Sequence, residues 1–110
     1  MIYVVENIYH LIQRVKNNPN KLIVLKCYMP WCGYCTKIKG EYEEMSMRNP
    51  DVIFLEVNME NDKAHGGEIA KRFQISGFPT FILIKDEKYV DEVVGANMEG
   101  LQDKIYNYTN

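Results

Sequence analysis

Two cysteines, Cys32 and Cys35, are separated by Gly33 and Tyr34 and directly follow Trp31. An apolar, strand-like segment precedes them and a helical pattern follows, so the pair is predicted to lie where a helix begins. A helix N-terminus carries partial positive charge and free N–H groups, which favour the thiolate form of Cys32. Cys35 falls one turn deeper on the same helix face, within reach of a disulfide. This arrangement predicts reversible dithiol–disulfide exchange, in which an exposed Cys32 attacks and a more buried Cys35 resolves the mixed disulfide.

The same spacing also occurs as half of a zinc site, which is the alternative for this segment. The residues that could complete such a site are Cys27, His10 and His65, but they form no second pair with zinc-finger spacing. Cys27 is expected to be a buried strand residue that behaves as a small hydrophobe, with a regulatory or glutathionylated thiol as the other interpretation. The two histidines are expected on the solvated surface, and no metal is predicted.

The strands that must position the cysteines are short apolar runs. They are predicted at residues 2–5, 22–28, 52–57, 81–84 and 89–94. Turn formers flank the second and third runs, which are rich in β-branched residues, as in a parallel sheet. The last two runs are separated by a short polar segment, residues 85–88, which indicates an antiparallel hairpin.

Apolar stripes at helical spacing predict four helices between and after these strands. The first covers residues 8–15, and the second runs from Gly33 to about Met47, with a kink expected at Gly40. A third helix follows somewhere after residue 62, and a fourth covers residues 98–108, with Asn97 as its N-cap. The resulting order, β-α-β-α-β-α-β-β-α, predicts a layered α/β fold.

Length and composition point to one domain, residues 1–110. Apolar residues make up 46% of the chain and charged residues 25%, and the net charge is −2. These values are typical of a single globular domain and show no electrostatic signature of binding to nucleic acid or to an anionic membrane. The N-terminal residues 1–7 contain no basic stretch followed by a long apolar one, so no signal peptide is expected.

Three separated segments resemble those of the thioredoxin family. They are residues 28–35 (YMPWCGYC), residues 78–80 (FPT) and residues 94–96 (VGA). A Cys-x-x-Cys near a βαβ pattern is itself typical of thioredoxin-like redox proteins. The resemblance implies the thioredoxin fold, with a central mixed sheet of four to five strands flanked by four helices. It also implies a thiol–disulfide oxidoreductase that reduces protein disulfides through Cys32 and Cys35, with no cofactor beyond their own disulfide.

The resemblance assigns further roles around the cysteine pair. Pro79 would follow a cis peptide bond, lie against the two cysteines and exclude a metal, while the backbone beside Phe78 would pair with an extended substrate strand. The remaining positions match the family's flat apolar surface for substrate binding. We refer to the full set as the docking surface: Trp31, Gly33, Tyr34, Met59, Gly77, Phe78, Val94, Gly95 and Ala96.

The chain departs from the family pattern at two places beneath the cysteines. Where thioredoxins bury an aspartate that assists proton transfer at the resolving thiol, this sequence has Lys26, and where they have a partner lysine it has Glu56. We therefore expect a charge-reversed ion pair beneath Cys35. A lysine could take part in proton transfer only if its amine were partly neutral, which burial favours and Glu56 opposes. Alternatively, Lys26 stays charged and favours both thiolates.

The dipeptide Gly33-Tyr34 is the other departure, because reductive thioredoxins usually have Gly-Pro there. A Cys-Gly-Tyr-Cys segment occurs in some bacterial disulfide isomerases, so an isomerase or oxidase is one alternative function, and a non-catalytic binding module is another. The resemblance implies protein disulfides as substrates, a thioredoxin reductase or glutathione as electron source, and a monomer. The expected location is the cytoplasm, where catalytic disulfides occur but structural ones are rare.

Overall fold

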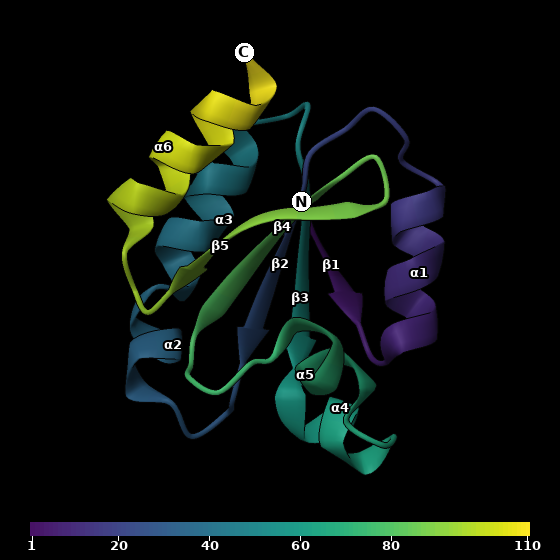
Figure 1. Ribbon diagram of the computed structural model, residues 1–110. Coiled ribbons are helices and arrows are strands. Elements are labelled where there is room, and N and C mark those ends of the chain that lie inside the picture. Colours follow the sequence, from purple (N-terminus) through teal and green to yellow (C-terminus); the bar gives the residue numbers. More distant parts are fainter.

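Five strands form one mixed sheet in the computed structural model, which describes all 110 residues (Figure 1). The strands are β1 (Ile2–Val5), β2 (Ile23–Tyr28), β3 (Ile53–Asn58), β4 (Thr80–Lys85) and β5 (Lys88–Val94). Their order in the sheet is β1-β3-β2-β4-β5. β3 pairs in parallel with both β1 and β2, whereas β4 runs antiparallel to β2 and to β5. All five predicted strands and the hairpin are thus confirmed.

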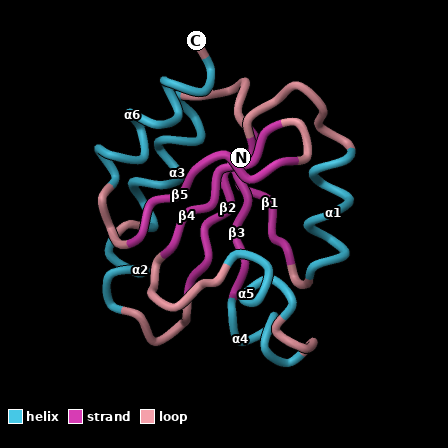
Figure 2. The backbone as a smooth tube through the Cα atoms, viewed as in Figure 1, coloured by secondary structure: helices cyan, strands magenta, loops and turns pink.

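Helices cover both faces of this sheet. They are α1 (Ile8–Lys16), α2 (Gly33–Lys37), α3 (Lys39–Arg48), α4 (Met59–Ala64), α5 (Glu68–Phe73) and α6 (Met98–Thr109). In Figures 1 and 2, α2, α3 and α6 lie on one side of the strands, and α1, α4 and α5 lie on the other. None of these helices has the length and apolar character needed to cross a membrane.

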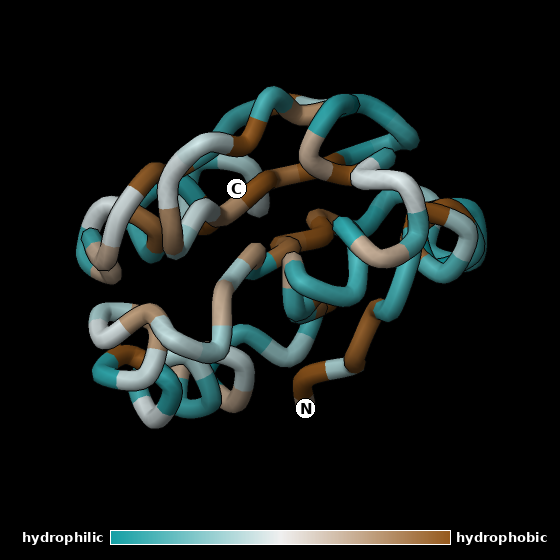
Figure 3. Tube along the Cα trace, turned by 90° about the horizontal axis from the view of Figure 1, so that it is seen from below, coloured by the Kyte–Doolittle hydropathy of each residue, from teal (hydrophilic) through white to brown (hydrophobic).

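Alternation along β2 divides the core into two clusters. Val24 packs with the cluster on the α3 and α6 side, whereas Leu25 and Cys27 pack with the cluster on the α1, α4 and α5 side. Successive side chains of a strand point to opposite faces, so Lys26 lies on the same side as Val24. Figure 3 shows hydrophobic stretches running through the middle of the molecule and hydrophilic stretches on much of its outside.

The expected kink at Gly40 is wrong in position. The helix that follows Cys32 breaks at Ile38, which separates α2 from α3 and has a backbone of φ −92° and ψ 1°. Ile38 is a buried member of the core, whereas a Cβ built on Gly40 would meet open space. The break thus falls at a buried core residue, and not at the glycine.

The helix expected after residue 62 is confirmed as α5, but a second short helix, α4, precedes it and was not predicted. With the division of the second predicted helix into α2 and α3, this brings the total to six. α4 and α5 are joined by Gly66 and Gly67, both of which adopt positive φ. The Asp62 carboxylate in α4 accepts hydrogen bonds from the N–H groups of Ile69 and Ala70, at 2.9 and 3.0 Å, and so holds the start of α5. By contrast, Asn97 caps α6 as predicted, because its side chain accepts from the Gly100 N–H at 2.9 Å.

Candidate active site

Cys32 is the N-cap residue of α2, the helix that starts just beyond the end of β2. Its Sγ accepts a hydrogen bond from the Cys35 N–H at 3.2 Å and lies 3.6 Å from the Phe78 carbonyl oxygen, to which its S–H can donate. A free helical N–H is thus aimed at the sulfur, which is the arrangement that favours a thiolate. All three cysteines are free thiols in this structure.

The expectation of an exposed Cys32 above a buried Cys35 is wrong. Cys32 is 6% exposed and Cys35 is 4% exposed, so the two thiols are almost equally covered. The backbone of the loop before β4 lies over Cys32, as the contact between the Cys32 sulfur and the Phe78 carbonyl oxygen shows. The electrostatic surroundings of the two thiols nevertheless differ. Burial raises the pKa of the Cys35 thiol to about 11, the neighbouring Cys32 adds to this, and the Met29 backbone and the Lys26 ammonium oppose it.

Two further loops complete the surroundings of Cys32. The Phe78–Pro79 peptide bond is cis, and Pro79 is buried. The Pro79 carbonyl accepts a hydrogen bond from the Gly95 N–H at 2.7 Å, which joins the proline loop to the loop after β5. Gly95 has a φ of +94°, a conformation that favours glycine. The Phe78 N–H has no hydrogen-bond partner within the chain, so it is free to pair with an added strand.

Most residues of the docking surface are exposed or half-buried. Trp31, Tyr34 and Val94 are 70%, 68% and 61% exposed, and the Trp31 ring meets the Phe78 ring edge-on at 6.3 Å. Gly33 and Ala96 are exposed, and Gly77, Phe78 and Gly95 are half-buried. Met59 is the exception, because it is 3% exposed and packs in the core cluster on the α4 side. Met59 begins α4, and this helix turns its side chain inward.

Lys26 is buried, at 4% exposed, but its predicted ion pair with Glu56 is wrong. The two residues are register partners in the parallel strands β2 and β3, yet no nitrogen–oxygen distance between them falls within 4.0 Å. The Lys26 Nζ instead lies 5.1 Å from the ring centroids of both Tyr28 and Tyr42. The ammonium is drawn to these ring faces because they are negative.

Comparison with known proteins agrees with this geometry. The family model described as Thioredoxin matches residues 4–107. The chain belongs to the thioredoxin family. It is 41% identical over 95 residues to a thioredoxin of Geodia cydonium, covering 84% of this chain and 85% of that protein. It is 37% identical over 90 residues to Thioredoxin H2-2 of Oryza sativa subsp. japonica, covering 82% of this chain but only 64% of that relative's length.

The fold is the thioredoxin fold. A thioredoxin f2, solved in a complex with ferredoxin:thioredoxin reductase, superimposes with a TM-score of 0.90 at 32% identity. The superposition covers 99% of this chain and 96% of that one. The α/β class and the family resemblance are therefore confirmed.

Cys27 lies on the opposite side of the sheet from Lys26. It is fully buried, and burial, together with the Asp62 carboxylate, raises the pKa of its thiol far above the ordinary range. It packs in the cluster on the α1, α4 and α5 side, as the prediction of a small core hydrophobe requires. His10 and His65 are exposed, and no three side chains of His, Cys, Asp or Glu gather into a group that could hold a metal.

Two tyrosines that flank the Lys26 ammonium were not predicted from the sequence. Tyr28 could have been found, because it lies two residues after Lys26 on the same strand and so on the same face. Tyr42 could not, because it reaches the site from α3, where its hydroxyl donates to the Leu55 carbonyl at 2.8 Å. In this thioredoxin-family site, Cys35 therefore shares a cavity with Lys26 and Tyr28.

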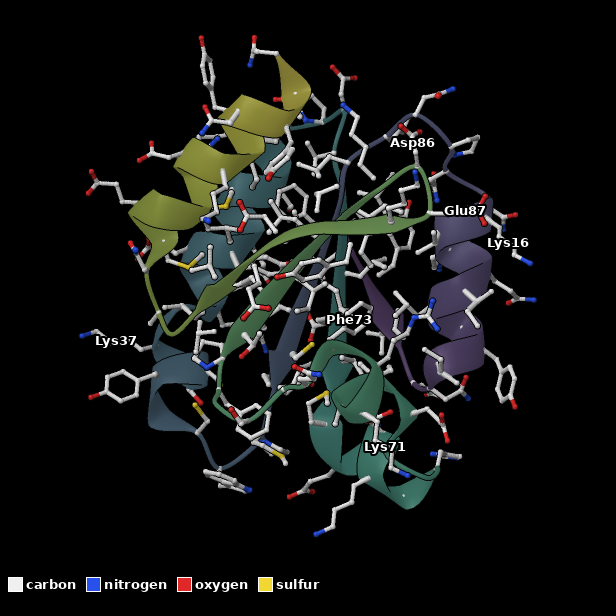
Figure 4. The ribbon with its side chains drawn as sticks, viewed as in Figure 1. Lys16, Lys37, Lys71, Phe73, Asp86 and Glu87 are labelled. Carbon is white, nitrogen blue, oxygen red and sulfur yellow. The ribbon has the colours of Figure 1, made fainter.

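A large hollow of this thioredoxin-family chain is remote from the cysteines. It is a groove of about 770 Å³ between α1, the end of α5 and the β4–β5 hairpin. In Figure 4, Phe73 extends from α5, while Lys16 and Glu87 lie near the hairpin turn. None of the docking-surface residues lines this groove.

Proposed function

We propose that this chain is a thiol–disulfide oxidoreductase that reduces disulfides in other proteins. The observation that carries the proposal is the placement of the Cys32 Sγ. The sulfur caps α2, accepts the Cys35 N–H and lies beside the cis Phe78–Pro79 bond, amid the exposed apolar side chains of the docking surface. Membership of the thioredoxin family supports the same activity.

The reaction divides between the two cysteines. The Cys32 thiolate attacks a substrate disulfide, forms a mixed disulfide and releases the first substrate sulfur as a thiolate. The Cys35 thiolate then attacks the Cys32 sulfur, so that the Cys32–substrate bond breaks, the Cys32–Cys35 disulfide forms and the second substrate sulfur leaves. Two electrons pass to the substrate. The cysteine pair itself carries them, so we propose that no bound cofactor is needed.

The substrate is proposed to be an extended segment of another protein. Its backbone would pair with the free Phe78 N–H, as a strand added beside the proline loop. Its apolar side chains would lie against Trp31, Tyr34 and Val94, which are exposed. A surface of this kind makes few side-chain-specific polar contacts, so it favours broad specificity.

A reductase is the proposed electron source, because a similar thioredoxin f2 has been solved with ferredoxin:thioredoxin reductase. Glutathione is the alternative donor. We further propose a monomer that acts in electron transfer and redox homeostasis of the cytoplasm. Neither nucleic acid nor membrane is a proposed partner. A reducing compartment fits the reductive direction, since it keeps the pair supplied with electrons.

Reduction of insulin disulfides by a dithiol donor tests the activity. The protein is expected to accelerate the reaction, Cys32→Ser to abolish the acceleration, and Cys27→Ala, the matched control, to retain it. If the protein leaves the rate of insulin reduction unchanged, and its Cys32→Ser variant keeps full biological function, the chain is instead a binding module.

Two further assays decide the direction of electron flow. Redox titration against glutathione gives the reduction potential of the pair, and reactivation of scrambled ribonuclease measures isomerase activity. A reductase is expected to be strongly reducing and a poor isomerase. Efficient reactivation of ribonuclease, with a reduction potential close to that of glutathione, would favour the alternative function of isomerase, which the Gly33-Tyr34 dipeptide suggests.

A further inference from the structure

Lys26 is a buried basic side chain that the proposed reaction does not use. It is 4% exposed, and its ammonium donates no hydrogen bond and makes no ion pair within the chain. The rings of Tyr28 and Tyr42 at 5.1 Å are the groups that face it. No fully buried side-chain nitrogen or oxygen lacks a hydrogen-bond partner, so the ammonium nitrogen keeps contact with solvent through the cavity beside it. Its positive charge can act on other groups that line this cavity.

The group that this charge can reach is the resolving thiol. Lys26 and Cys35 line one cavity of about 190 Å³. The cavity is large enough for water, which would solvate the ammonium and give protons a route from the thiol to bulk solvent. Its other walls come from β2, the loop that follows it, α2, α3 and β3: Tyr28, Met29, Pro30, Thr36, Lys39 and Glu56.

We propose that the Lys26 ammonium stabilises the thiolate of Cys35 and thereby speeds the resolution of the mixed disulfide. This inference rests on the proposed function. In the step concerned, the Cys35 thiol loses its proton to water in the cavity, and the thiolate attacks the Cys32 sulfur. The Cys32–substrate bond breaks, the Cys32–Cys35 bond forms, and the departing substrate thiolate takes up a proton from solvent. Lys26 keeps its own proton throughout and acts through Cys35.

The other titratable groups around Lys26 come from four elements, β2, β3, α2 and α3. Burial lowers the pKa of Lys26, while Glu56 on β3, Cys35 on α2 and Glu43 on α3 raise it, and Lys39 on α3 lowers it. Burial, and then the Glu56 carboxylate, raise the pKa values of Tyr28 and Tyr42. Both tyrosines are therefore neutral near pH 7, and Glu56 and Glu43 favour retention of the Lys26 proton.

The expected effect on rate is moderate. Even with the ammonium nearby, the pKa of Cys35 is about 11, so the thiolate is scarce at neutral pH. A further rise of about one unit would lower the thiolate population about tenfold. A thiolate of higher pKa is also the better nucleophile, with a Brønsted coefficient of about 0.4–0.5, so the net slowing is about three- to fourfold.

Two measurements on the full chain test this inference, with Lys26→Met as the main variant. The first follows, by stopped flow at pH 7, the release of the second thiolate of a symmetric aromatic disulfide, which reports the attack of Cys35 on the Cys32 sulfur. The second mixes reduced protein with excess oxidised glutathione, quenches with acid and determines by mass spectrometry how much Cys32–glutathione adduct accumulates. We expect the second release to slow about three- to fourfold and the adduct, at low occupancy, to increase by the same factor, as the slower resolution requires.

Two matched variants separate charge from packing. Lys26→Arg retains the charge and should keep the rate of the second release close to that of the wild type. Lys39→Met removes an exposed lysine from the same cavity and should slow this release much less than Lys26→Met. An unchanged release rate and an unchanged adduct fraction in Lys26→Met would overturn the inference. If instead the wild-type protein neither forms the adduct nor becomes oxidised, the proposed function itself fails.

Discussion

The three cysteines show how position in the fold gives one residue type different chemistry. Cys32 meets the N–H of Cys35 at a helix start. Cys35 has a pKa raised by burial but a cation near it. Cys27 is fully enclosed on the other side of the sheet. At the residue scale, Cys32 is thus suited to the proposed role of nucleophile and Cys35 to that of resolving thiol, while the third thiol serves as core.

Lys26 is expected to destabilise the protein, and Lys26→Met to stabilise it. Burial lowers the pKa of Lys26 in the folded state, so the unfolded chain binds this proton more tightly. The resulting loss of stability is complete below the folded pKa and disappears as pH rises past the unfolded value of about 10.4. The substitution should therefore raise the free energy of unfolding at pH 7, and by less near pH 10.

Urea unfolding of the variant and the wild type at both pH values measures this gain. Lys37→Met is the control, because Lys37 is exposed on α2 and points away from the molecule (Figure 4). It should change stability little at either pH. A Lys26→Met variant that is less stable than the wild type at pH 7 would contradict the expectation.

At the scale of the elements, α4 and α5 are the helices that depend most on tertiary contacts. Each has six residues, too few for a helix that is stable by itself. The Asp62 carboxylate joins them through its two hydrogen bonds to the start of α5, and it is 1% exposed. This carboxylate does the work of an N-cap side chain, because Gly67 at the cap position has none.

Asp62→Ala is therefore expected to lower the free energy of unfolding by about 2–3 kcal/mol, since it removes a charged acceptor from two buried N–H groups. Asp62→Asn keeps one acceptor oxygen and should cost less. Glu60→Ala, an exposed change in the same helix, should cost little. Thermal or urea unfolding ranks the three variants, and equal losses in Asp62→Ala and Glu60→Ala would show that the carboxylate does not hold α5.

At the scale of the whole molecule, one sheet is shared by two core clusters. The Cα radius of gyration is 12.7 Å, close to the roughly 13 Å typical of a single domain of this length. Tyr42 connects α3 to two strands at once, with its hydroxyl on the Val24 and Leu55 carbonyls. Both clusters pack against the same sheet, so unfolding of the sheet on one side would also expose the cluster on the other side. We therefore expect both clusters to unfold together.

The expected result is a single cooperative unfolding transition, in which far-UV circular dichroism and tyrosine fluorescence have the same midpoint. Leu101→Ala lies in the cluster on the α6 side and Leu11→Ala in the cluster on the α1 side. Each should cost about 2–5 kcal/mol and shift both signals equally. Separate midpoints, or a variant that moves only one signal, would show two independent units.

Local patterns in the sequence are enough to specify several features of this protein. The Cys32–Cys35 spacing, the five strands, the hairpin and the Asn97 cap follow from periodicity and from side chains a few residues apart. The thioredoxin arrangement of the sheet followed from resemblance to the family, since no local pattern specifies which strands pair.

Features that depend on contacts between distant segments became known only from the folded chain. The break at Ile38, the inward Met59 and the nearly equal burial of Cys32 and Cys35 arise from packing onto the sheet and from the proline loop. Lys26 shows this most clearly. Its neighbour in β3, Glu56, was correctly expected from the family resemblance. Its ammonium nevertheless lies against two rings, one of them from α3, because the free energy of a charge inside a protein depends on every element around it.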